Sequence, residues 1–138
     1  MTSRAAARLG LALLVGTLVA CGGQSTDPRC AAQQALRDAI RAVDLAEAAE
    51  DSGDPAAVRR QVDEAGRLVR LARSRLGAAQ STAGGDGAAR RMLEAANYLA
   101  FIVEDFAASG EVDGALAQFA ARELNAAGSG VGGTPLNC

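Results

Sequence analysis

The chain has 138 residues, enough for one modest hydrophobic core, and a formal net charge of −2. Its basic side chains are all arginine, because the sequence contains neither lysine nor histidine. Their absence excludes Ser-His-Asp, Cys-His and Ser-Lys catalytic arrangements and removes the commonest metal ligand. We therefore expect a protein that is not an enzyme and that binds no metal or other cofactor.

The first twenty residues predict a signal peptide. Residues 1–8 carry Arg4 and Arg8, and the next twelve residues, LGLALLVGTLVA, are apolar and uncharged. As a helix, twelve residues span roughly 18 Å, which is too short to cross a bilayer core of about 30 Å. A cleaved targeting segment therefore fits residues 1–20 better than a membrane-spanning helix does.

The end of this segment, Leu18-Val19-Ala20-Cys21, resembles the lipobox of bacterial lipoproteins. The resemblance implies that the peptide is cut before Cys21 and that lipid, such as palmitate, is attached through its sulfur. Two or three acyl chains hold a protein stably on a membrane. The protein would then lie on the cell membrane or the outer membrane, facing the periplasm or the cell exterior. The resemblance covers residues 1–21 and implies nothing about the remaining chain. An ordinary secretory signal followed by an unrelated cysteine is the alternative.

The mature chain would begin with a short tether. Residues 21–27, CGGQSTD, are mostly small and polar, which is typical of a flexible linker. Residues 28–138 are then expected to form a single helical domain. Losing Arg4 and Arg8 leaves 12 arginines against 16 acidic residues, so the mature chain has no general electrostatic reason to bind nucleic acid.

Three cysteines are explained by this arrangement. If Cys21 carries lipid, Cys30 and Cys138 remain in an oxidising compartment. We predict that these two form a disulfide that ties the start of the helical domain to its end. Two free thiols are the alternative.

Four helices are expected after the tether. Asp27-Pro28 and Asp54-Pro55 are typical helix starts, with Asp as the N-cap and Pro as the first helical residue. They predict helices over about 28–51 and 55–80. Two more helices are expected over about 88–108 and 112–127, with a break at Gly110. Asp113 or Ser109 is the expected N-cap of the last helix. We predict an antiparallel up-down four-helix bundle, with a three-helix bundle, fused across residue 110, as the alternative.

Apolar spacing predicts the buried face of each helix. The clearest pattern alternates steps of four and three residues over 55–80, at Val58, Val62, Ala65, Val69, Ala72, Leu76 and Ala79. In the helix over 28–51 the predicted face is Leu36, Ile40 and Val43. In the last two helices it is Met92, Ala96, Leu99, Val103 and Phe106, then Val112, Ala115, Leu116, Phe119 and Ala126.

Five larger apolar residues lie off these faces: Leu45, Leu71, Tyr98, Phe101 and Leu124. They either fill the flanks of the core or form an exposed patch for a protein partner or an acyl chain.

Arginines on the second helix form a possible partner-binding strip. Arg59, Arg70 and Arg73 lie within about 60° of one another on a helical projection. Such a strip suits an acidic partner, phosphate headgroups or an anionic polymer. The alternative is a solvated face whose charges pair within the helix, as Arg59–Asp63 and Asp63–Arg67, and with acidic side chains of the first or third helix.

Other charged motifs favour no catalytic or metal chemistry. Residues 51–54, DSGD, resemble part of a calcium loop but lack its remaining ligand positions, and a turn with a helix cap explains them. Glu94, Glu104 and Asp105 are expected to be surface charges. A hydrolase based on two carboxylates stays formally open, although a bundle this small rarely makes a suitable cleft.

These observations favour an anchored, non-enzymatic protein-interaction module whose partner is another envelope protein. The alternative is a carrier or sensor that binds a hydrophobic ligand between the helices. A carrier needs an enclosed apolar cavity of a few hundred Å³, whereas an interaction module would show a filled core and an exposed patch.

Overall fold

The structure is a computed structural model that describes residues 27–80, 87–131 and 135–138. It has four helices, α1 (Pro28–Asp51), α2 (Pro55–Gln80), α3 (Gly87–Ser109) and α4 (Gly114–Ser129), and no strand among the described residues. The predicted all-α fold class is confirmed. The three-helix alternative is wrong, because Gly110, with a left-handed φ of 77°, separates α3 from α4.

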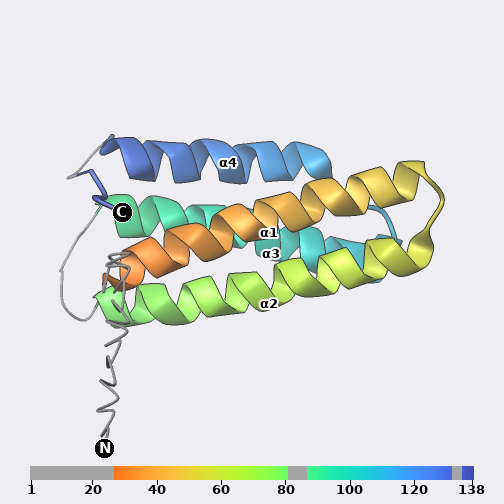
Figure 1. Cartoon of the computed structure of the whole chain (residues 1–138), viewed down its shortest axis with the longest axis horizontal. Helices are drawn as coiled ribbons and strands as arrows, with labels where there is room; N and C mark the ends of the chain where they lie inside the picture. Colours follow the sequence, from red (N-terminus) through yellow and green to blue (C-terminus); the bar gives the residue numbers. More distant parts are fainter. Residues whose placement is uncertain (1–26, 81–86, 132–134) are drawn as a thin grey trace, which may run out of the picture.

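The helices run alternately up and down, so that α1 and α3 point one way and α2 and α4 the other (Figure 1). Helix α1 contacts the three other helices, whereas α2 and α4 lie on opposite sides of the bundle. Because four antiparallel helices bring both chain ends to one pole, Cys30 and Cys138 meet there. They form the predicted disulfide, with their Cα atoms 5.6 Å apart.

Local capping sets the helix ends. Asp27 accepts a hydrogen bond from the Arg29 backbone N–H at 2.9 Å, and Asp54 accepts one from the Ala57 backbone N–H at 2.9 Å. Residues 51–54 are therefore a helix-to-helix turn, as predicted. Helix α4 begins two residues later than predicted, because Asp113 accepts from the two backbone N–H groups that follow Gly114. It ends at Ser129, two residues beyond the predicted end at about 127, because Gly130 adopts the left-handed cap conformation.

The core consists mainly of alanine and branched aliphatic residues. All seven positions of the predicted α2 face are buried, as are Leu36 and Val43 on α1. Gly66 lets α3 approach closely, because a Cβ atom there would lie 3.3 Å from a Val103 methyl carbon. Its helix-weakening effect is therefore offset by packing.

The predicted core face of α4 is wrong. Its buried residues are Ala117, Ala120, Leu124 and Ala127, whereas Phe119 is 46% exposed and Ala115 is exposed. Small side chains occupy the side of α4 that faces α1 and α3, and the wide ring of Phe119 lies on the flank. Leu124, expected off the buried face, is 2% exposed. On α3, Val103 and Phe106 are half-buried instead of forming the centre of the core.

Candidate interaction surface

The predicted arginine strip follows the groove between α2 and α3. Arg70 and Arg73 line a surface hollow of about 280 Å³, which we call the groove hollow. Its other lining residues are Gly66, Val69, Ala100, Val103 and Glu104. The Arg73 side chain also donates a 2.8 Å hydrogen bond to Asn97 Oδ1 on α3. Arg59 lies eleven residues before Arg70, roughly 16 Å along the helix, and lines a different hollow. The structure therefore brings two of the three arginines together.

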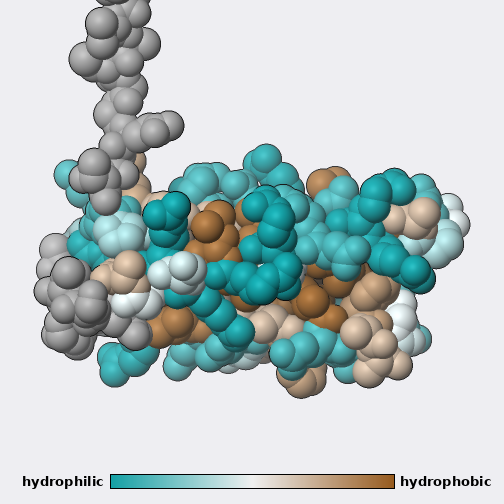
Figure 2. All heavy atoms as spheres, turned by 90° about the horizontal axis from the view of Figure 1, so that it is seen from below, coloured by the Kyte–Doolittle hydropathy of each residue, from teal (hydrophilic) through white to brown (hydrophobic). Residues whose placement is uncertain are grey.

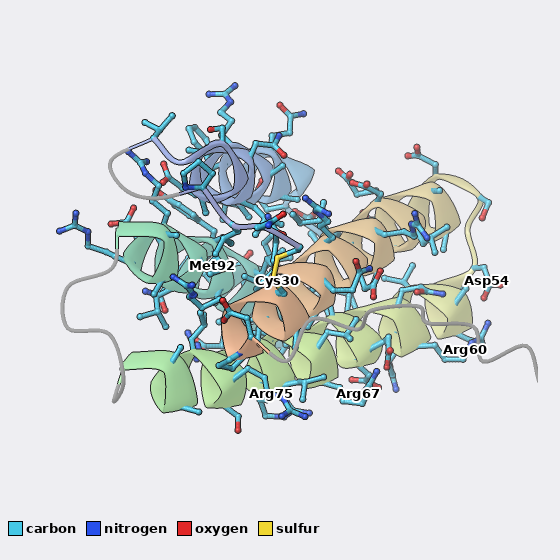
Figure 3. The ribbon with its side chains drawn as sticks, turned by 60° about the vertical axis from the view of Figure 1, so that its left-hand side comes forward. Cys30, Asp54, Arg60, Arg67, Arg75 and Met92 are labelled. Carbon is cyan, nitrogen blue, oxygen red and sulfur yellow. A yellow bond between two sulfur atoms is a disulfide. The ribbon has the colours of Figure 1, made fainter. Side chains whose placement is uncertain are left out.

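The intrahelical pairs suggested as the alternative, Arg59–Asp63 and Asp63–Arg67, are not present among the described residues. Arg67 instead pairs with Glu64, at 2.6 Å, and its hydrogen bonds lower the pKa of the Glu64 carboxyl. Arg60, Arg67 and Arg75 project from the outer side of α2, away from the bundle (Figure 3). Within the described part of the chain, Arg70 has neither an ion pair nor a hydrogen bond, so its charge is free for a partner.

None of the aromatic side chains is fully buried, although Tyr98 and Phe106 pack against the core. The chain has three phenylalanines and one tyrosine. Phe101 is 55% exposed, Phe119 is exposed on α4, and Tyr98 and Phe106 are half-buried. Aromatic residues usually dominate core energetics because each can bury a large apolar area. In this protein that area stays at least partly accessible to solvent.

Three of these rings gather where α3 meets α4. The Tyr98 and Phe119 ring centroids are 5.9 Å apart, and the Arg122 guanidinium carbon lies 5.2 Å from the Phe119 centroid. Tyr98, Phe101 and Leu116 line a surface hollow of about 460 Å³. Tyr98, Phe101, Leu116 and Phe119 together are called the aromatic patch below. Glu94 and Asn97 form the polar side of its hollow.

The sequence predicted only part of this patch. The apolar spacing places Tyr98 and Phe101 off the predicted core faces, but it places Leu116 and Phe119 on the predicted core face of α4. The other exposed off-face residues, Leu45 (49%) and Leu71 (39%), lie on α1 and α2 and do not belong to the patch. Figure 2, which views the bundle from the α2 side, shows hydrophobic residues at the surface among many hydrophilic ones.

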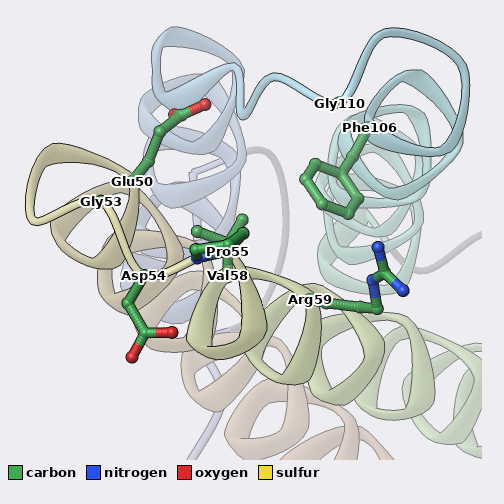
Figure 4. Close-up of a pocket in the computed structure, with 8 residues that line it drawn as sticks. All are labelled: Glu50, Gly53, Asp54, Pro55, Val58, Arg59, Phe106 and Gly110. Atoms are coloured by element: carbon green, nitrogen blue, oxygen red, sulfur yellow. The ribbon is translucent and has the colours of Figure 1, made fainter.

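A further hollow of about 280 Å³ lies at the pole far from the disulfide. Its apolar lining includes Val58 and Phe106, and its charged groups are Glu50, Asp54 and Arg59. In Figure 4 the Arg59 side chain extends beneath the Phe106 ring, whereas the two carboxyl groups lie on the other side and point in different directions. The carboxyl groups therefore do not converge on a common point, as an acid–base pair acting on one bond would require.

One carboxyl group occupies an unfavourable position. Glu47 on α1 is half-buried, and its carboxyl group lies against Gly114, where any side chain would collide with it. Burial raises the pKa of Glu47, and the negative charges of its neighbours add to this shift. These neighbours are Asp44, Asp51, Glu50 and Asp113.

Among the described residues, no three cysteine or acidic side chains are grouped closely enough to hold a metal ion. None of the four helices is long and apolar enough to span a membrane. Cys21, predicted to carry the lipid, lies outside the described residues, as do residues 1–20 and all of the tether except Asp27. No family model, curated protein or solved structure matches the chain.

Proposed function

We propose that this chain is a lipid-anchored lipoprotein of the bacterial cell envelope whose helical bundle is a non-enzymatic module that binds another protein. Lipid on Cys21 would hold it at the cell membrane or the outer membrane, facing the periplasm or the cell exterior. The anchor follows from the lipobox resemblance of residues 18–21. The binding role is supported chiefly by one observation: no aromatic side chain is fully buried, and three of them gather in the aromatic patch, where Phe101 and Phe119 are exposed.

The composition of the patch suits a protein interface. Interfaces typically have an apolar, aromatic centre and a polar rim, and a few aromatic or arginine residues supply most of the binding energy. Here Phe101 and Phe119 form the exposed apolar centre, and Glu94, Asn97 and Arg122 lie beside it. Burying a whole phenylalanine side chain contributes about 1.5–3 kcal/mol, so covering the exposed half of each ring would contribute roughly 1 kcal/mol per ring.

A carrier of a hydrophobic ligand is less well supported. Such a ligand would need an enclosed apolar cavity between the helices. The groove hollow, the hollow of the aromatic patch and the hollow at the pole far from the disulfide all lie at the surface, and buried residues from the four helices pack the interior.

The test is affinity capture of the anchored protein from solubilised membranes of its native host, measured by quantitative mass spectrometry. We expect a captured protein whose yield falls at least tenfold for the double variant Phe101→Ser/Phe119→Ser. Leu45→Ser is the matched control, because it removes an equally exposed apolar side chain from α1. Its capture should equal that of the wild type.

Equal capture by the patch variant and the control would contradict the assigned binding surface. The triple variant Arg59→Ala/Arg70→Ala/Arg73→Ala tests the predicted arginine strip in the same experiment. An unchanged set of partners would eliminate the strip as a binding site for another protein.

A further inference from the structure

The outer face of α2 carries a row of arginines that makes no contact with the other helices. Arg60, Arg67 and Arg75 project away from the bundle (Figure 3), and all three are exposed. From Arg60 to Arg75 the row extends over about 22 Å of helix. Arg67 pairs with Glu64 on the same helix, whereas Arg60 and Arg75 form no ion pair with any residue that the structure describes. These three residues are called the outer arginine row below.

Charge is distributed unevenly between α2 and the rest of the described chain. Helix α2 carries six arginines and two acidic residues, whereas the other described residues include six arginines and thirteen acidic residues. The fold does not neutralise this excess of positive charge. Among the arginines of α2, Arg67 alone pairs with a carboxylate of the described residues, and Arg73 donates its hydrogen bond to the neutral side chain of Asn97. Positive charge thus stays available along the whole helix, which suits an extended array of negative charges.

An apolar side chain lies within the outer arginine row. Leu71 is 39% exposed and stands one turn after Arg67 and one turn before Arg75, about 40° from each around the helix. Arginines spaced over 22 Å do not converge on one small anion, and α2 has no aromatic side chain on which nucleic-acid bases could stack. Arginines flanking an exposed leucine match a surface of anionic lipid, where phosphates meet the guanidinium groups and the leucine enters the headgroup region.

We propose that the outer face of α2 lies on the anionic lipid headgroups of the membrane that holds the chain. The inference rests on the proposed lipid anchor, because an anchored chain stays close to the bilayer. A weak attraction then suffices to select which side of the bundle faces the lipid. Phosphate oxygens accept hydrogen bonds from the outer arginine row, and Leu71 lies between the headgroups.

This orientation leaves the aromatic patch accessible to a protein partner. Helices α2 and α4 lie on opposite sides of the bundle (Figure 1), so lipid beneath α2 leaves Phe119 and Arg122 of α4 facing away from the membrane. The reverse orientation is unfavourable, because it would bring Glu94, which lines the hollow of the patch, against negatively charged headgroups. Helix α4 carries one arginine and one acidic residue, and so has no net charge to attract such a surface.

Tryptophan fluorescence tests this orientation, because the chain contains no tryptophan of its own. Leu71→Trp places a single reporter within the outer arginine row, and Phe119→Trp places one at a similarly exposed position of α4 as the control. Each full-length gene is expressed in the native host, and the chain is purified from its membranes. It is then reconstituted into vesicles of phosphatidylglycerol and phosphatidylcholine that include a phosphatidylcholine with a nitroxide on its headgroup. We expect the nitroxide to quench the Leu71→Trp emission at least twofold and to leave the Phe119→Trp emission nearly unchanged.

Charge variants identify the groups that hold the lipid. In the Leu71→Trp chain, Arg60→Gln/Arg67→Gln/Arg75→Gln should abolish the quenching, as should vesicles of phosphatidylcholine alone. Quenching that persists in this triple variant would refute the role of the outer arginine row.

A matched variant controls for net charge. Arg37→Gln/Arg41→Gln/Arg90→Gln removes three exposed arginines from α1 and α3 and should leave the quenching of Leu71→Trp unchanged. An equal loss in both triple variants would show that net charge, and not the outer face of α2, attracts the lipid.

Flotation of the same samples on a density gradient separates this inference from the proposed anchor. Flotation with both kinds of vesicle, but with equal quenching at positions 71 and 119, would overturn the orientation and leave the anchor supported. Flotation with phosphatidylglycerol vesicles alone, with selective quenching of Leu71→Trp, would support the contact through α2 and overturn the anchor. A chain that floats with neither kind of vesicle would overturn both.

Discussion

Replacing Cys30 and Cys138 by serine opens a covalent loop in which the two residues are 108 positions apart in sequence. In the chain-entropy description, closing a loop of this length stabilises the folded state by about 5 kcal/mol, because the unfolded chain loses conformations. The free serines also release the end of the chain in the folded state. Pro135, Asn137 and Cys138 are exposed, and Leu136 is partly buried against the core, so this release returns roughly 1 kcal/mol of conformational entropy.

We therefore expect Cys30→Ser/Cys138→Ser to lower the free energy of unfolding by about 4 kcal/mol. Domains of this size have total stabilities of about 5–15 kcal/mol, so the variant should fold but with a much reduced margin. Its helical content in buffer should match that of the oxidised parent, because the bond joins the first turn of α1 to the chain beyond α4 and neither cysteine is among the buried core residues. With a urea slope of about 1–3 kcal/mol per M, the unfolding midpoint should fall by roughly 1–4 M.

The assay is urea unfolding of the mature chain followed by far-UV circular dichroism, with Cys21→Ser in every sample so that two cysteines remain. The reduced parent should have the same unfolding midpoint as the double-serine variant. This comparison separates loss of the bond from any effect of the serine side chains. Equal midpoints for the oxidised parent and the variant would refute the loop-entropy reasoning. Two alkylatable thiols in the parent would refute the disulfide itself.

Glu47→Gln should increase stability at pH 7, because burial and four neighbouring acidic residues raise the pKa of Glu47 above its usual 4.5. The folded wild type binds the Glu47 proton more tightly than the unfolded chain does, so its stability falls as pH rises from 4.5 through the raised pKa. In urea titrations the stability advantage of the variant should therefore vanish below pH 4.5. A stability difference between variant and wild type that stays constant with pH would contradict this explanation. Gly77→Ala should stabilise the protein by up to about 1 kcal/mol, because a Cβ atom at this position of α2 meets no atom within 4 Å. Gly130→Ala should destabilise the protein by about 1 kcal/mol or more, because Gly130 has a φ of 76° and packs against Pro135. Thermal unfolding measures the stability change caused by each substitution. Changes of the same sign for Gly77→Ala and Gly130→Ala would contradict the backbone conformations assigned to these two glycines. Cys21→Ser should abolish lipid attachment and release the chain from host membranes on fractionation; membrane association identical to that of the parent would contradict the lipid anchor.

The sequence alone determined the helices and most of their ends. Asp27-Pro28 and Asp54-Pro55 define the starts of α1 and α2, and Gly110 separates α3 from α4. These signals act within one or two helical turns, between residues close in the chain, so they can be recognised without knowing the fold. The heptad spacing of α2 likewise predicted its buried face, because a long regular stripe leaves one side of the helix to be covered.

Tertiary structure alone decided which side of α4 is buried and where the arginines and aromatic rings lie. Phe119 is more apolar than Ala117 or Ala120, yet the alanines face the core because neighbouring helices leave room for small side chains there. The ring rests on Tyr98, which is 21 residues away in sequence.

Arg73 could not be assigned its hydrogen bond to Asn97 without the register between α2 and α3. That register also brings Gly66 and Val103 together, and both residues line the groove hollow between α2 and α3. Such contacts depend on the distance and register between helices, which are set by all the side chains packed between them and not by any short segment of sequence.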